Sequence, residues 1–158
     1  MVSSRYKSVK KNNHLFSTDN SIKIWSQDDD DSYVLKKTLK KHSHVVSEID
    51  LSADNSHFVS SSYDKTINLW DMNKLDSPNR FHAHTKAVLS VAMSQDGRAI
   101  VSGGADKQTI VWNVQGTFKI RTEAHKSFVN QVAFNPVFQN IFFSCSEVIL
   151  HIYVFGIF

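Results

Sequence analysis

A repeat of about 42 residues is the feature that most constrains the fold of this chain. His42, His84 and His125 stand 42 and 41 residues apart. Four, seven and nine residues after each histidine the side chain is apolar in all three units, and these positions hold Val46, Ile49 and Leu51, then Val88, Val91 and Met93, then Val129, Val132 and Phe134. Because repeated units of this size bury their apolar faces against one another, we expect a row of similar modules.

Each unit contains the alternation of strand and turn that is typical of antiparallel β structure. Turn-forming residues at 52–55 and 94–97 separate the apolar segments from β-rich segments at 58–60 and 100–102. A second tight turn at 63–65 or 105–107 leads to a third strand at 66–70 or 109–112. Strands and turns that recur with a period of about 40 to 45 residues predict an all-β fold of four-stranded propeller blades.

A second spacing recurs in two units and predicts a buried chain of polar side chains. The intervals from histidine to serine, aspartate and tryptophan are the same in both units, which are His42, Ser60, Asp64 and Trp70, and His84, Ser102, Asp106 and Trp112. We expect the indole N–H to donate to the serine hydroxyl, the serine to the imidazole, and the imidazole to the aspartate. The same trio recurs without an exposed nucleophile elbow or an oxyanion loop, so the chain is predicted not to be an enzyme.

These motifs resemble those of the WD40-repeat family. Within residues 35–136, the segments that carry the resemblance are His42-Ser43-His44-Val45-Val46-Ser47, Asp64-Lys65-Thr66-Ile67, His84-Thr85-Lys86-Ala87-Val88-Leu89-Ser90-Val91 and Ile100-Val101-Ser102-Gly103. They look most like one branch of that family, the receptors for activated C kinase, which are seven-bladed propellers. The resemblance implies a cytoplasmic, non-enzymatic scaffold that binds the small ribosomal subunit and signalling proteins such as protein kinase C.

The repeat divides the chain into unequal parts. We expect a non-repeat leader at residues 1–13, a partial first blade at 14–41, complete WD40 repeats at 42–83 and 84–124, and a degenerate or truncated repeat at 125–158. In the last unit Val148 and Val154 occupy the aspartate and tryptophan positions, which indicates a truncated chain or a gene-model error. Two complete and two partial blades amount to a fragment of a seven-bladed propeller, and its open sheet faces favour self-association.

Composition narrows the class of protein further. With 18 Lys and Arg against 15 Asp and Glu, the net charge of +3 is too small to indicate a nucleic-acid-binding protein. The single cysteine, Cys145, permits no intrachain disulfide and fits a reducing cytoplasm. The apolar run at 148–158 is too short for a membrane-spanning helix. The five glycines form no phosphate-binding loop and the histidine pairs 42/44 and 82/84 lack partners at zinc spacing, so we expect neither cofactor nor metal.

Two charged clusters are candidate binding sites. Lys36, Lys37, Lys40 and Lys41 precede His42 and form either a solvated outer strand or a dock for a phosphate backbone. The resemblance implies that Lys37 and Lys40, with Lys41 beside them, face ribosomal RNA, whereas a basic turn of the family's first blade is replaced by Thr-Asp-Asn at 18–20. The aspartate run at 28–31 is either a solvated loop or a site for a cation or a basic partner.

A candidate protein-binding rim is expected where the tight turns emerge from the blades. His44, Tyr63, Lys86 and Lys126 flank the polar chains at that rim. Tyr63 is either an exposed anchor for a partner or a cover for the next blade. The leading hypothesis is a scaffold for the small ribosomal subunit and signalling proteins. The alternatives are a WD40 subunit of a complex unrelated to translation and a truncated fragment without independent function.

Overall fold

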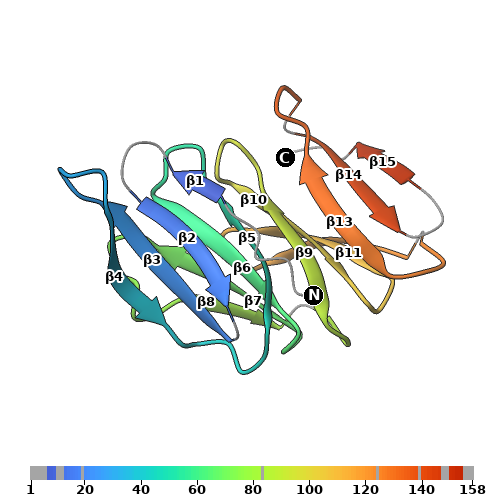
Figure 1. Cartoon of the computed structure of the whole chain (residues 1–158). Helices are drawn as coiled ribbons and strands as arrows, with labels where there is room; N and C mark the ends of the chain where they lie inside the picture. Colours follow the sequence, from blue (N-terminus) through green and yellow to red (C-terminus); the bar gives the residue numbers. More distant parts are fainter. Residues whose placement is uncertain are drawn as a thin grey trace.

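Four antiparallel β-sheets stand side by side in the computed structural model (Figure 1). The structure describes residues 7–9, 13–18, 20–82, 84–123, 125–138, 140–146 and 150–154. The first sheet contains β1 (Lys7–Val9), β2 (Asn13–Thr18), β3 (Ser21–Gln27) and β4 (Tyr33–Leu39), and the second contains β5 (Val46–Leu51), β6 (His57–Ser62), β7 (Thr66–Asp71) and β8 (Asn79–His82). The third contains β9 (Val88–Met93), β10 (Ala99–Gly104), β11 (Thr109–Asn113) and β12 (Phe118–Thr122), and the fourth contains β13 (Val129–Phe134), β14 (Ile141–Ser146) and β15 (Leu150–Val154).

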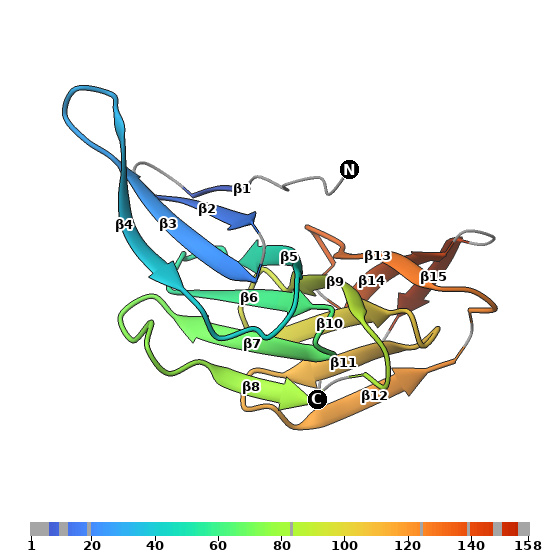
Figure 2. The same cartoon turned by 60° about the horizontal axis from the view of Figure 1, so that its bottom comes forward.

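Strand order within each sheet follows the sequence, so every sheet is an up-and-down meander. The first strands of successive sheets are neighbours, because β5 packs against β9 and β9 packs against β13. Figure 2 shows these three strands in one row, with the remaining strands of each sheet leading away from it. Sheets arranged in this way are propeller blades. The all-β fold of propeller blades predicted from the repeat is therefore confirmed.

The core of the molecule lies between the blades. Alternation along each strand gives a sheet two faces, and each inner face is buried by the neighbouring blade. Three clusters of buried apolar side chains fill the three interfaces, with Ile22, Ile24, Leu39, Phe58 and Trp70 at the first, Val59, Phe81, Val91, Ile110 and Trp112 at the second, and Val101, Val111, Val129, Val132 and Phe142 at the third. Trp70 and Trp112 each stack on a phenylalanine, with ring centroids 5.4 Å apart for Trp70 and Phe58 and 5.9 Å apart for Trp112 and Phe81.

Gly103 marks a close approach between the third and fourth blades. A Cβ atom at this position would stand 2.5 Å from Cγ1 of Val129 and 3.1 Å from Cγ1 of Val132. The neighbouring Gly104 leaves room for the His84 ring in the same way, since its Cβ would lie 2.6 Å from Nδ1 of that ring. The missing side chains therefore let β13 and the histidine pack directly on the β10 backbone.

Two strands form in parts of the chain where the repeat motif is missing or incomplete. Lys7–Val9 lie in the expected leader, yet they form β1 and pair with β2 in a register that sets Lys7 opposite Leu15. In the last unit, which lacks the aspartate and tryptophan of the motif, Leu150–Val154 still form β15 and pair with β14. Val148 lies outside the described residues. Both strands form through backbone hydrogen bonds, which need no motif side chain.

The blades present two ends with different connections. One end, which we call the histidine end, consists of the connections 40–45, 63–65, 84–87, 105–108 and 125–128, which include all three anchor histidines. The connections at this end are interlocked: the Tyr63 amide donates to the Val45 carbonyl and the Ala105 amide to the Ala87 carbonyl, both at 2.9 Å. The other end, which we call the opposite end, consists of the connections 28–32, 52–56, 72–78, 94–98, 114–117 and 135–138.

Candidate functional site

The four motif side chains of the second blade form one hydrogen-bonded chain across the blade. The Trp70 indole donates to the Ser60 hydroxyl at 2.9 Å, Ser60 Oγ lies 2.8 Å from His42 Nε2, and His42 Nδ1 lies 2.9 Å from Asp64. The serine is on β6, the tryptophan on β7, and the histidine in the connection before β5. The chain therefore ties that connection to two strands and to the tight turn between them.

The third blade repeats this arrangement. Trp112 donates to Ser102 at 3.2 Å, Ser102 Oγ lies 2.9 Å from His84 Nε2, and His84 Nδ1 lies 2.8 Å from Asp106. In the fourth blade His125 Nε2 lies 2.7 Å from the hydroxyl of Ser144. The structure thus brings together all eight residues that the spacing placed in the two complete chains, and it adds a histidine–serine pair in the next blade.

Asp64 closes the chain and also holds the tight turn. Its carboxylate accepts hydrogen bonds from the Ser43 amide at 3.0 Å and from the amide and hydroxyl of Thr66 at 3.0 and 2.6 Å. Burial acts to raise the pKa of Asp64, but the bonds from Thr66, Ser43 and His42 outweigh it and hold that pKa at about 2. The pKa of Asp106 is likewise lowered, because bonds from His84, Thr85 and Gln108 outweigh burial. Both turns are therefore closed around an anionic carboxylate.

Burial lowers the pKa of His42 despite the adjacent carboxylate of Asp64. A neutral ring that donates from Nδ1 to Asp64 keeps a lone pair on Nε2, which can accept from Ser60. The Asn68 amide lies 3.2 Å from the same Nε2, and Arg80 Nε donates to the other end of that amide. Ser60 is fully buried, so its hydroxyl is shielded from solvent within the blade.

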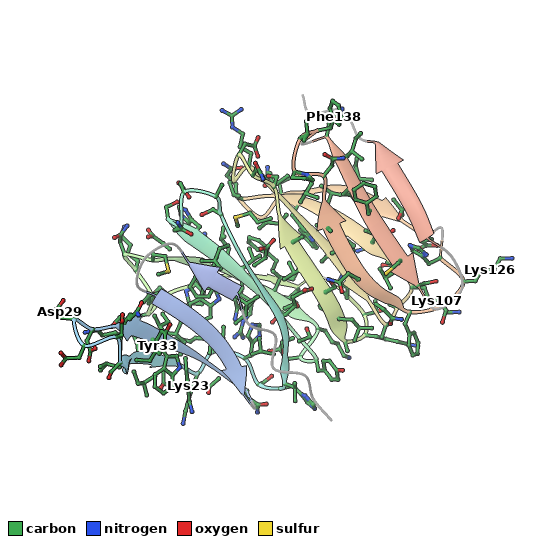
Figure 3. All side chains as sticks on the ribbon, turned by 45° about the horizontal axis from the view of Figure 1, so that its top comes forward. Lys23, Asp29, Tyr33, Lys107, Lys126 and Phe138 are labelled. Atoms are coloured by element: carbon green, nitrogen blue, oxygen red, sulfur yellow. The ribbon has the colours of Figure 1, made fainter. Side chains whose placement is uncertain are left out.

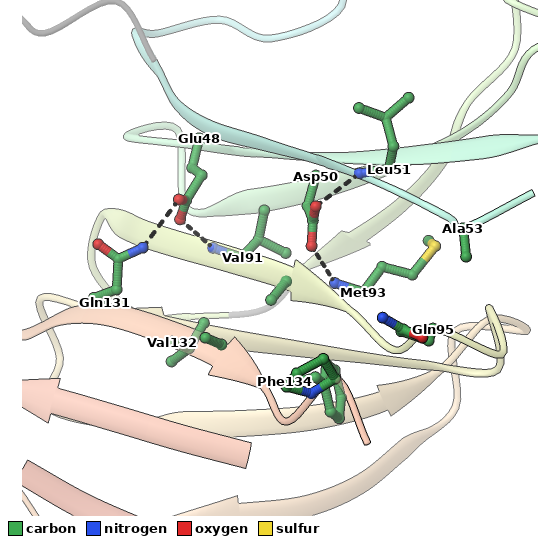
Figure 4. A pocket seen from close by; sticks show the side chains of 13 residues that line it. Glu48, Asp50, Leu51, Ala53, Val91, Met93, Gln95, Gln131, Val132 and Phe134 are labelled. Atoms are coloured by element: carbon green, nitrogen blue, oxygen red, sulfur yellow. Dashed lines mark hydrogen bonds between the residues drawn. The ribbon is translucent and has the colours of Figure 1, made fainter. Parts of the chain in front are cut away.

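Glu48 and Asp50 on β5 are polar residues that the sequence analysis did not single out. Glu48 accepts a hydrogen bond from the Ser90 hydroxyl. It also accepts from the Val91 amide at 3.1 Å and from the Gln131 amide at 3.2 Å (Figure 4). Asp50 accepts from the Met93 amide at 2.8 Å. These contacts join the first strands of three blades. They border a pocket of about 350 Å³ lined by β5, β9 and β13.

A positional signal for Glu48 was present in the sequence. The sixth residue after each anchor histidine is polar in all three units, at Glu48, Ser90 and Gln131. These side chains contact one another across the blades, and Ser90 Oγ also accepts from the Val132 amide at 3.0 Å. A comparison of the polar positions of the repeat, as well as the apolar ones, could therefore have predicted that these three residues have a shared role.

The candidate rim residues are exposed at the histidine end. Tyr63 is 45% exposed, and its ring stacks on that of His44 with centroids 5.8 Å apart and an interplanar angle of 20°. Lys86 and Lys126 are exposed in the equivalent connections of the next two blades. The structure thus places all four at one end, where about half of the Tyr63 side chain is exposed.

The lysine cluster is divided by the structure. Lys37 lies on β4, where its ammonium contacts Asp76 of the 72–78 connection at 2.9 Å. Lys36 also lies on β4, the outer strand of the first sheet, whereas Lys40 and Lys41 are exposed in the connection from β4 to β5, so only part of the cluster lies on an outer strand. Near them the Asn20 amide donates to the Ser43 carbonyl at 3.4 Å. Thr18 ends β2, and Asp19 lies outside the described residues.

The aspartate loop at 28–31 is closed on itself. Asp28 Oδ1 accepts from the amides of Asp30 and Ser32 at 3.1 and 2.8 Å, and Gln27 donates to Asp31 at 2.6 Å. Within the described ranges, no group of three or more His, Cys, Asp and Glu side chains is arranged to hold a metal ion. The same ranges contain no helix long and apolar enough to cross a membrane.

Comparison with known proteins identifies the repeat. The family model described as WD domain, G-beta repeat, matches residues 33–71 and 76–113. A chromatin assembly factor 1 subunit FAS2 homolog of Oryza sativa subsp. japonica is 30% identical over 137 residues, which are 78% of this chain. Small ribosomal subunit protein RACK1 of Drosophila melanogaster is 40% identical over 105 residues, 64% of this chain. Nuclear distribution protein nudF of Aspergillus niger is 30% identical over 122 residues, 76% of this chain.

The matched regions span 27%, 33% and 27% of these three relatives, so the chain corresponds to about a third of their length or less. Their names refer to chromatin assembly, the ribosome and nuclear distribution, and their similarity to this chain is of the same order. The chain carries WD40 repeats and is homologous to WD-repeat proteins.

Proposed function

We propose that this chain is a non-catalytic scaffold that binds other proteins through its histidine end. The observation that carries the proposal is the stacked pair of Tyr63 and His44, which is exposed on turns that the His42–Asp64 bond holds in place. An aromatic side chain presented by a rigid backbone is the usual centre of a protein interface, since little entropy is lost when it becomes buried.

The buried chains explain why this end suits binding. Each chain fixes two connections by hydrogen bonds to side chains that are shielded from water, so the surface residues between them occupy defined positions. Ser60 and Ser102, the only serines paired with a histidine in these two chains, are fully buried and hydrogen-bonded to His42 and His84. Neither hydroxyl is therefore exposed to act as a nucleophile. The names of two relatives, a chromatin assembly factor 1 subunit homolog and a small ribosomal subunit protein, describe components of larger assemblies, which supports the same role here.

Quantitative affinity capture from cell extract tests the proposal. The parent chain is compared with Tyr63→Ala at the histidine end and with the control Gln95→Ala, which removes a side chain from the opposite end. We expect a defined set of proteins to be captured by the parent and the control and to be lost with Tyr63→Ala. Capture of the same set by all three chains would show that Tyr63 is not an anchor.

A second candidate function is binding to the small ribosomal subunit, together with signalling proteins such as protein kinase C, in the cytoplasm. It is supported by the 40% identity to a small ribosomal subunit protein and by the exposed Lys40 and Lys41, which suit a phosphate backbone. Lys37 supports it less, because Asp76 already pairs with that ammonium. A WD40 subunit of a complex unrelated to translation is the competing hypothesis, and the other relatives favour it.

Cosedimentation with purified small subunits separates these two roles. RNA contact predicts that Lys40→Glu with Lys41→Glu abolishes cosedimentation, that Lys37→Ala has little effect, and that binding by the parent weakens steeply with salt. If the double variant cosediments like the parent, the ribosome hypothesis fails for this chain. The scaffold proposal would survive that result, since it rests on Tyr63.

A further inference from the structure

The two ends of the blade array carry opposite charge. Each of the five connections that define the histidine end contributes at least one exposed lysine, and these are Lys40, Lys41, Lys65, Lys86, Lys107 and Lys126. The connections of the opposite end contribute exposed aspartates at 28–31 and at Asp54, Asp76 and Asp96. In Figure 3 Lys107 and Lys126 lie on one side of the molecule and Asp29 on the other.

The carboxylates at the histidine end do not cancel these lysines at the surface. The side chains of Asp64 and Asp106 are only 5% and 4% exposed, and their oxygens accept the hydrogen bonds that close the turns. Glu123 is exposed just after β12, where it accepts a hydrogen bond from Gln108 at 2.8 Å. A partner that approaches this end therefore meets mainly ammonium groups.

The backbone fixes the positions of these charges. Lys65 and Lys107 occupy the same place in successive blades and share a left-handed conformation, with φ of 73° and 72°. The Lys65 carbonyl accepts from the His84 amide at 3.4 Å, which links its turn to the next blade. Strands of about six residues rise about 20 Å, or roughly two Debye lengths at physiological salt. The charges of the two ends are therefore largely screened from each other. Each end presents its own charge to a partner, although the net charge of the whole chain is only +3.

We propose that the histidine end binds an acidic segment of a partner protein. The proposal rests on the proposed scaffold function and names the chemical class of its partner. Carboxylates of the segment contact the lysines, and an apolar side chain of the segment packs on Tyr63 or on Phe128, which are 45% and 44% exposed. These two aromatic rings favour a protein over a duplex nucleic acid, which offers them no apolar side chain.

A binding titration with synthetic probes tests the proposal. The probes are a Glu-rich peptide with one central Phe, the same peptide with Gln in place of Glu, and an RNA duplex of similar charge. The test variant combines Lys86→Glu and Lys126→Glu. The matched control combines Lys74→Glu and Arg98→Glu, which changes the net charge equally at the opposite end.

We expect the parent to bind the Glu peptide and not the Gln peptide, with an affinity that falls as salt rises. The test variant should bind about tenfold more weakly, since the two reversed charges replace attraction to the peptide carboxylates by repulsion. The control should remain within about twofold of the parent. Equal losses in both variants would mean that only net charge matters and would overturn the proposal.

Two other outcomes also contradict it. No binding of the Glu peptide, or tighter binding of the RNA duplex with loss in the same test variant, would assign the lysines to something other than an acidic protein segment. Affinity capture with Tyr63→Ala separates this failure from failure of the scaffold itself. If capture still depends on Tyr63 while the peptide does not bind, only the acidic class of partner is wrong.

Discussion

In the second blade the polar chain depends on a histidine that stays neutral, His42. Asp64 accepts from Nδ1 of His42, and this fixes the tautomer that leaves Nε2 free to accept from Ser60. A protonated ring would carry a hydrogen on both nitrogens. Its Nε2 could then no longer accept a hydrogen bond from the Asn68 amide or the Ser60 hydroxyl. The lowered pKa of His42 is therefore consistent with the geometry of its partners.

Removal of the indole donor tests the energy of this chain. In Trp70→Phe the buried Ser60 loses the donor that lies 2.9 Å from its hydroxyl, and we expect the free energy of unfolding to fall by about 1–3 kcal/mol. Urea denaturation measures the change. Tyr63→Phe is the exposed control and should change stability by less than about 0.5 kcal/mol. Trp70→Phe is also introduced into Ser60→Ala, which lacks the acceptor hydroxyl. If it lowers the free energy of unfolding by the same amount there as in the parent, the loss comes from packing and not from the hydrogen bond.

The same histidine predicts how stability depends on pH. Folding lowers the pKa of His42 below its usual value of about 6.5, so the unfolded chain takes up a proton at this residue before the folded chain does. The free energy of unfolding should therefore fall as pH drops from about 7 to about 5. Asp64 does not contribute in this window, because its pKa of about 2 and the usual aspartate value both lie below it.

Urea denaturation across this range measures the slope. His42→Gln should be less stable than the parent near neutral pH but should show a shallower fall toward acidic pH. His44→Gln, which replaces an exposed histidine of the same connection, should keep the slope of the parent. Identical slopes in the parent and in His42→Gln would mean that the ring titrates alike in the folded and unfolded chains.

At the scale of strands and blades, the sequence predicted what the side-chain pattern encodes and missed what the backbone or long-range contacts supply. The period predicted the all-β blades and the apolar positions that face neighbouring blades. It missed β1 (Lys7–Val9), because a strand held by backbone pairing needs no motif. It also could not reveal that Lys37 pairs with Asp76, since that contact joins two blades across 39 residues. It did not single out Glu48, whose hydrogen-bond partners lie on two other blades.

Gly103 provides a test of how closely two blades approach. In Gly103→Ala the new Cβ would meet Val129 Cγ1 at 2.5 Å, so β13 must shift, and we expect a loss of about 1–3 kcal/mol. Val129→Ala removes the obstructing methyl groups. The double variant should therefore lose less stability than the sum of the two single variants, as measured by urea denaturation. Additive losses would show that the two positions are not in contact.

At the scale of the whole molecule, apolar side chains pack between neighbouring blades, and polar contacts also connect blades that are not neighbours. Glu48 of the second blade binds Ser90 and Val91 of the third blade and Gln131 of the fourth. Ser47 of the second blade also donates to the Val88 carbonyl of the third at 2.7 Å. Because such bonds are directional, they fix the angle between blades, which apolar packing alone leaves less defined.

An exchange of partners tests this link between three blades. In Glu48→Gln the new amide nitrogen has to face either Gln131 Nε2 or the Ser90 and Val91 donors, and we expect a loss of about 1–3 kcal/mol. In the double variant with Gln131→Glu, the carboxylate at position 131 accepts from the amide nitrogen at position 48. The amide oxygen at position 48 can then still accept from Ser90 and Val91 on β9. The double variant should recover at least about 0.5 kcal/mol relative to the sum of the single variants in urea denaturation. If each change lowers stability independently, Glu48 does not join the second blade to the fourth.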